Sequence, residues 1–136
     1  MSSYKIIEHE YDVVVLGAGG AARAVAGSLA AHGASSVRFL NRTSERARSA
    51  CVHLEGFFPE TRFESSSLDG DAFGAVASHS ALIVNCLSAG PEAVVGGFDV
   101  SVLPDDAIWA DINYWMPIQP LLDVCRQRGL RVSDGV

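Results

Sequence analysis

Short apolar runs recur along the chain at regular intervals. The first, residues 12–16, reads Asp-Val-Val-Val-Leu, and such a β-branched run is typical of a strand that is buried on both faces of a parallel sheet. Glycine and polar residues bound the later runs. The predicted strands cover residues 12–16, 36–41, 62–64, 81–85, 107–111 and 131–133.

Segments of helical composition lie between most of these strands. Residues 21–32 are rich in alanine, and Gly33 follows them at the position where a glycine commonly ends a helix. Thr43 is a suitable N-cap residue for the second helix. The predicted helices cover residues 21–32, 44 to about 54, 71–77 and about 120 to 128.

Strands that alternate with helices at this spacing are joined by right-handed crossovers and form a parallel sheet. We therefore predict the α/β class: a doubly wound parallel sheet (Rossmann fold) with helices on both faces, a three-layer αβα arrangement. A length of 136 residues is enough for one domain with a sizeable core. We expect residues 1–136 to form a single domain, with residues 1–10 as an N-terminal extension.

The composition narrows the setting in which the protein works. Hydrophobic residues make up 49% of the chain and charged residues 19%, as in soluble globular proteins. No apolar run approaches the ~20 residues that span a membrane. The three cysteines are widely spaced and include no CxxC pair, which favours reduced thiols in a cytoplasmic protein. The four histidines lack the spacing of metal ligands, so no metal site is predicted.

The charges are unevenly distributed. The net charge of −6 divides into +1 for residues 1–62, −9 for residues 63–125, and +2 for residues 126–136. The middle segment contains no lysine or arginine. A nucleic-acid partner is not expected, because a phosphate backbone requires a basic face. Any bound anion should instead be held by arginines in the first third of the chain.

A glycine-rich turn follows the first predicted strand. It consists of Gly17, Ala18, Gly19, Gly20, Ala21 and Ala22, and it fits the G-x-G-x-x-A form of the dinucleotide fingerprint. Gly17 permits the tight turn, and Gly19 lets the backbone approach a pyrophosphate at the start of the next helix. Two alternatives are a structural turn without a ligand and a methyltransferase. The second usually needs an acid at the end of the second strand, which is absent here.

The second predicted strand ends at a group of residues suited to a 2′-phosphate. Arg42 lies 23 residues past Gly19, near the place where NAD-specific sites carry an acidic residue. Asn41 and Thr43 offer neutral hydrogen bonds, and Arg46 lies one helical turn further on. This pattern favours NADP. The alternative is that these arginines solvate an exposed helix.

Two of these segments resemble the shikimate dehydrogenase family. Residues 15–24, which read VLGAGGAARA, are similar to the family's glycine-rich segment, and the pattern from Asn41 through Thr43 to Arg46 is similar to its NADP motif. Later matches lie at residues 84–90, 111–114, 120–122 and 131–135. The resemblance covers roughly residues 11–136.

The resemblance implies further contacts at the nicotinamide end of the site. Cys86, Leu87 and Ser88 correspond to the family's loop beside the nicotinamide ribose. Tyr114 could touch nicotinamide or substrate, or could only seal the edge of the sheet. The chain departs from the family at Leu87 and Pro91, where the family usually has threonine and methionine.

The resemblance also implies a function for the chain. It is that of the NADP(H)-binding domain of an oxidoreductase of aromatic amino acid biosynthesis, which interconverts 3-dehydroshikimate and shikimate. The family carries its catalytic lysine–aspartate pair and its substrate-binding serines in a preceding domain. We identify no catalytic residue in this chain and expect it to be inactive alone, with a missing substrate-binding domain or a partner chain supplying that half.

Two other functions stay open, and so does the location of one apolar segment. The chain could be the nucleotide domain of another NADP oxidoreductase such as glutamyl-tRNA reductase, which shares an Asn-Arg-Thr motif. It could also be a stand-alone NADP-binding or partner-docking module without chemistry of its own. The apolar residues between Phe98 and Trp109 could form core, or could be surface that meets another domain.

Overall fold

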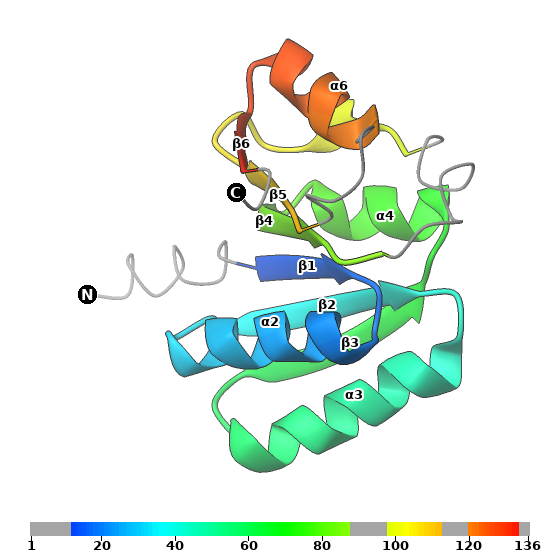
Figure 1. The fold of residues 1–136 in the computed structure, drawn as a ribbon, viewed down its shortest axis with the longest axis vertical. Coiled ribbons are helices and arrows are strands. Elements are labelled where there is room, and N and C mark those ends of the chain that lie inside the picture. Colours follow the sequence, from blue (N-terminus) through cyan, green and yellow to red (C-terminus); the bar gives the residue numbers. More distant parts are fainter. Residues whose placement is uncertain (1–11, 88–97, 113–119, 134–136) are drawn as a thin grey trace.

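The computed structural model describes residues 12–87, 98–112 and 120–133, and these residues contain a six-stranded parallel sheet (Figure 1). The strand order is β3-β2-β1-β4-β5-β6, so the direction of strand addition reverses between β1 and β4. This is the Rossmann-type order expected from the alternation of strands and helices. The strands are β1 (Asp12–Leu16), β2 (Ser36–Asn41), β3 (Arg62–Ser67), β4 (Ser80–Asn85), β5 (Ile108–Asp111) and β6 (Arg131–Ser133).

Helices cover both faces of the sheet, as predicted. The helical elements are α2 (Gly20–Ala31), α3 (Ser44–Phe57), α4 (Gly70–Ala77), the short 3₁₀ helix η1 (Val100–Val102) and α6 (Pro120–Arg128). Helices α2 and α3 pack on one face, and α4, η1 and α6 pack on the other. Figure 1 shows α6 beside β5 and β6, at the far side of the sheet from α3.

Alternating side chains of β1 divide the core into two layers. Val13 and Val15 point into the layer under α2 and α3, whereas Val14 and Leu16 point into the opposite one. The first layer contains three buried alanines of α2, spaced four residues apart, which let that helix lie close to the sheet. Because α2 begins at the glycine-rich turn, this close packing also fixes the amino end of the helix at the edge of the sheet.

Aromatic side chains fill the second layer. Phe73 of α4 stacks on Phe98 with ring centroids 4.5 Å apart, and its ring lies 6.4 Å from that of Trp109. Phe98 and Trp109 are both buried. Of the two interpretations of this apolar segment, core is therefore correct for these two residues.

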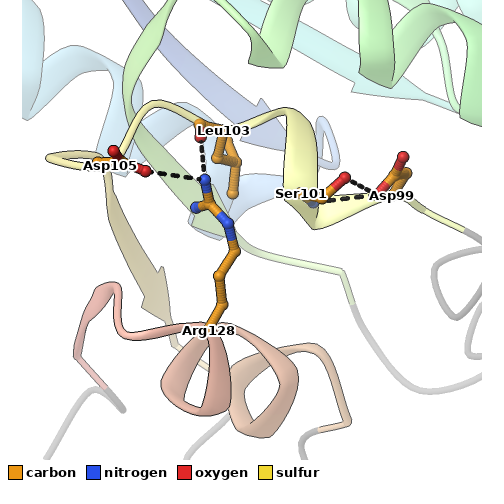
Figure 2. A network of polar contacts seen from close by, with 5 residues as sticks. All are labelled: Asp99, Ser101, Leu103, Asp105 and Arg128. Carbon is orange, nitrogen blue, oxygen red and sulfur yellow. Dashed lines mark hydrogen bonds and ion pairs between the residues drawn. The ribbon is translucent and has the colours of Figure 1, made fainter.

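Arg128 of α6 forms polar contacts with the segment that leads into β5. Figure 2 shows Arg128 reaching from α6 to this segment, where its Nη2 donates to the carbonyl oxygen of Leu103 at 2.6 Å and lies 3.3 Å from Asp105 Oδ1. Nearby, Asp99 accepts the backbone N–H of Ser101 at 3.0 Å and begins η1. Arg128 thus supplies a cation to a stretch of sequence that has none of its own.

Strand β3 and helix α3 extend about three residues further than predicted. Strand β3 runs to Ser67 rather than to residue 64, because it pairs with β2 over all six residues despite its run of serines. Helix α3 runs to Phe57 rather than to about residue 54. The rings of His53 and Phe57, four residues apart, lie 5.2 Å from each other and support the additional turn across Gly56.

Candidate functional site

A cleft of about 310 Å³ opens where the carboxyl ends of β1, β2, β4 and β5 meet. In open α/β sheets, ligands bind at this edge, at the point where the strand order reverses. The volume lies at the lower end of the ~300–1,000 Å³ usual for ligand pockets. The cleft is lined by Gly17, Ala18, Gly19, Gly20, Ala21, Ala22, Asn41, Arg42, Thr43, Arg46, Cys86, Leu87 and Ile112.

Backbone hydrogen bonds join the ends of the four strands that meet at this cleft. The first residue after β1, β4 or β5 donates its N–H to the last or penultimate carbonyl of a neighbouring strand. Gly17 donates to Leu40 at 2.8 Å, Cys86 to Leu16 at 2.9 Å, and Ile112 to Asn85 at 3.2 Å. The loops that line the cleft are therefore held to one another as well as to their own strands.

Gly17 is a turn position that requires glycine. Its φ angle is +112°, a region that residues with a side chain rarely adopt. A Cβ atom there would also lie only 3.3 Å from the carbonyl oxygen of Cys86. The tight turn and the close approach of the two loops both depend on this residue.

The amino end of α2 faces the cleft with its backbone exposed. Gly19 is the N-cap residue, and no side chain among the described residues accepts a hydrogen bond from the first turn. A Cβ atom built on Gly19 or Gly20 would meet no atom within 4 Å. Free N–H groups and the helix dipole make such an end favourable for a phosphate group.

Cationic side chains lie on the β2 side of the cleft. Arg42 and Arg46 are exposed and line it, and within the described part of the chain neither forms an ion pair. Asn41 Nδ2 donates to the carbonyl oxygen of Thr43 at 3.0 Å, which shapes the connection to α3. Thr43 is the N-cap residue of α3, but its hydroxyl makes no capping hydrogen bond to the helix.

Arg23 connects the glycine-rich turn to α3. Its Nε donates to the carbonyl oxygen of Ala18 at 3.3 Å, and its Nη2 donates to that of Arg46 at 3.4 Å. The side chain is thus engaged in holding two walls of the cleft together. This bridging position was not predicted from the sequence.

The β4 side of the cleft is less polar. Cys86 and Leu87 line it. Burial, and to a smaller extent the charge of Asp111, raises the pKa of the Cys86 thiol to about 12. The thiol is therefore protonated at neutral pH and is a poor nucleophile. Ser88 and Tyr114, the other two residues predicted for this end, lie outside the described residues.

Ile112 also lines the cleft and was not predicted from the sequence. Ile112 follows β5 directly and joins the cleft through its backbone bond to Asn85. Its place after a strand at the ligand-binding edge of the sheet was the available signal.

The described residues show neither a metal centre nor a membrane-spanning helix. Within residues 12–87, 98–112 and 120–133, no three His, Cys, Asp or Glu side chains gather closely enough to hold a metal ion. None of the helices in these ranges is long and apolar enough to cross a membrane.

Comparison with known proteins supports a relationship to shikimate dehydrogenases. The family described as Shikimate / quinate 5-dehydrogenase matches residues 4–69. Over 126 residues the chain is 39% identical to the shikimate dehydrogenase (NADP(+)) of Chelativorans sp. (strain BNC1), an alignment that covers 90% of this chain and 42% of that protein. The chain therefore spans less than half the length of this relative.

Solved structures agree with the fold. The quinate dehydrogenase from Corynebacterium glutamicum in complex with NAD has a TM-score of 0.75 at 27% identity, over 92% of this chain and 44% of that one. The shikimate 5-dehydrogenase from Listeria monocytogenes, in complex with shikimate and NAD, has a TM-score of 0.79 at 19% identity. That match covers all of this chain and 50% of the other, and at this identity it supports the fold alone.

Proposed function

From this similarity and from the geometry of the cleft, we propose that the chain is the NADP(H)-binding domain of a shikimate-dehydrogenase-like oxidoreductase. The observation that carries the proposal is the composition of the cleft. A glycine-rich turn meets the exposed amino end of α2 on one side, and two arginines without ion-pair partners in the described structure lie on the other. An anionic, two-part ligand fits this arrangement.

The charges on the β2 side favour NADP over NAD. A ribose 2′-hydroxyl is usually recognised by an acidic residue, which would repel a 2′-phosphate. Here Asn41, Arg42 and Thr43 occupy that region, and Arg46 adds a second guanidinium. Planar guanidinium groups bind phosphate through paired charge-assisted hydrogen bonds.

Each part of the cleft has a separate task in this proposal. The N–H groups at Gly19, Gly20 and Ala21 would bind the pyrophosphate, and Gly17 keeps the turn tight enough to present them. The segments after β4 and β5 would contact the nicotinamide half. When bound, the nicotinamide supplies or accepts the hydride.

The substrate-binding half would lie in another domain or chain. The proposal has three further parts. This domain is the C-terminal one of a complete enzyme, the substrates of that enzyme are shikimate and 3-dehydroshikimate, and this chain is inactive alone. The alignment with the relative from Chelativorans sp. (strain BNC1) covers 42% of that protein, which supports a separate substrate-binding half, and the name of that relative supports the substrates. A reducing compartment such as the cytoplasm fits three cysteines that are all free thiols.

Nuclear magnetic resonance of the 136-residue chain tests where the cofactor binds. On titration with NADPH, we expect backbone amide shifts at residues 17–22, 42–46 and 86–87. Amides at the opposite end of the sheet, such as those of Thr61 and His79, should stay in place. Binding without shifts at the glycine-rich turn, or no binding at millimolar NADPH, would contradict the proposal.

A further inference from the structure

A buried asparagine lies at the carboxyl end of β4, beneath the cleft. Asn85 is paired in register with Leu16 of β1 on one side and with Asp111 of β5 on the other. Its side-chain Nδ2 donates to Asp111 Oδ2 at 2.9 Å. Asn85 is 8% exposed and Asp111 2%, so this contact is shielded from water.

Asn85 also accepts hydrogen bonds from one residue after β4 and one residue after β5. Its side-chain Oδ1 accepts the backbone N–H of Leu87 at 3.1 Å. Its backbone carbonyl accepts the N–H of Ile112 at 3.2 Å. Leu87 and Ile112 line the cleft, whereas Asn85 and Asp111 do not.

The hydrogen bonds of Asn85 leave its side chain little freedom. The amide must point Nδ2 at the carboxylate and Oδ1 at Leu87, because the reverse orientation would place two oxygens together. Hydrogen bonds to a charged acceptor are stronger than neutral ones, and a buried polar group without its partner is costly. The backbone of Leu87, the second residue after β4, is therefore held in one position by Asp111 acting through Asn85.

The next step rests on the proposed function. With its pyrophosphate at the glycine-rich turn and its 2′-phosphate at Arg42, a dinucleotide would extend its other half across the strand-order reversal. That half would meet the segments after β4 and β5. We propose that Asn85, oriented by Asp111, is a positioning residue that fixes Leu87 and Ile112 as the binding surface for the nicotinamide half. It sets the affinity for that half independently of the adenosine half.

The test compares a whole ligand with half of it. NADPH contains both halves, whereas adenosine 2′,5′-bisphosphate carries only the adenosine and phosphate groups. The affinities of both ligands are measured by calorimetry for the unmutated 136-residue chain and for Asn85→Ala, Asp111→Asn and Ser80→Ala. Ser80 is the matched control, because it is a buried polar residue at the other end of β4 whose hydroxyl donates to Val76 at 2.7 Å.

We expect Asn85→Ala to weaken NADPH binding by about 10-fold, while adenosine 2′,5′-bisphosphate changes by less than about twofold. Asp111→Asn keeps the shape but replaces a charged acceptor with a neutral one. It should change the ratio of the two affinities in the same direction by a smaller factor, about two- to threefold. Ser80→Ala should leave the ratio unchanged even if it lowers stability.

The outcomes separate this inference from the function on which it rests. If both ligands weaken equally in Asn85→Ala, or neither does, Asn85 has no positioning role. If Asn85→Ala does not fold, an unchanged ratio in Asp111→Asn overturns the inference. If the unmutated chain binds the two ligands equally well, the nicotinamide half has no binding surface here and the inference fails while the adenosine site stands. If neither ligand binds, the proposed function fails first.

Discussion

At the residue scale, the cofactor preference that we propose depends on the guanidinium groups at the end of β2. Arg42→Ala should weaken NADP binding by about 10- to 100-fold and leave NAD binding nearly unchanged, because a charged hydrogen bond contributes roughly 1.5–3 kcal/mol. The matched control is Arg48→Ala, which removes a nearby exposed arginine, on helix α3, that does not line the cleft. Equal losses for NADP and NAD, or an equal effect of the control, would contradict this assignment. Calorimetric titration measures both.

Gly19 offers a test of the glycine-rich turn itself. A Cβ atom there meets nothing within 4 Å, so Gly19→Val should fold normally. The side chain would occupy the space from which a pyrophosphate approaches the helix, and we expect NADPH binding to be abolished. Circular dichroism checks the fold, and a fluorescence titration checks binding. Native spectra combined with full affinity would make the turn purely structural.

The thiol of Cys86 gives a prediction that depends on pH. Its pKa of about 12 reduces the thiolate fraction at pH 8 by on the order of 10³-fold relative to an ordinary cysteine. The pKa values of Cys51 and Cys125 are also raised, mainly by burial. All three should resist iodoacetamide in the native chain and react rapidly in urea. Because a raised thiol pKa favours the protonated folded form, stability from this source should decline as the pH rises above about 9. Rapid native alkylation of Cys86 would contradict its burial and its raised pKa.

The roles of cleft residues could be predicted from the sequence where the residues stand at fixed positions relative to a strand end or a helix start. Eleven cleft residues lie in or beside the turn after β1 and the ends of β2 and β4. The residues of the turn and of the end of β2 were identified from their spacing, whereas Cys86 and Leu87 were identified from the family resemblance. The bridging contacts of Arg23 and the hydrogen bonds of Asn85 could not be, because they join loops that are far apart in the chain. Such contacts depend on the relative position of strands, which one sequence does not specify.

At the element scale, helix α4 contains a glycine whose replacement tests local stability. Gly74 lies inside it, and an added Cβ atom would meet nothing within 4 Å. Gly74→Ala should stabilise the fold by about 0.5–1 kcal/mol. Gly33→Ala is the matched control, because its Cβ atom also meets nothing but its φ angle is +99°, so it should destabilise. Chemical denaturation measures both, and changes of the same sign would contradict the explanation.

Element positions followed from sequence more closely than element ends did. Apolar β-branched runs located β1, β2, β4 and β5, because these strands are paired on both sides. Strand β3 was underestimated since its serines carry no hydrophobic pattern, and its length depends on pairing with β2. The short helix η1 was not predicted, because its start depends on the side chain of Asp99 and its position on Arg128 of α6.

At the scale of the whole molecule, the strand order follows from two physical regularities. Right-handed crossovers and the burial of both sheet faces restrict the possible arrangements to a few, and the observed order β3-β2-β1-β4-β5-β6 is one of them. The reversal between β1 and β4 then brings the glycine-rich turn, the arginines and the loop after β4 to one edge. The fold explains the uneven distribution of charge along the chain. Arg42 and Arg46, from the first segment, line the cleft, whereas the acidic segment contributes no charged side chain to its described lining.

The central claim is that this cleft binds a dinucleotide with a 2′-phosphate. The most direct test is calorimetric titration of the unmutated 136-residue chain with NADP and, separately, with NAD in the same buffer. We expect NADP to bind at least about 10-fold more tightly, a difference that should shrink at high salt because the arginines are exposed. Equal affinities for NADP and NAD, or tighter binding of NAD, would contradict the account.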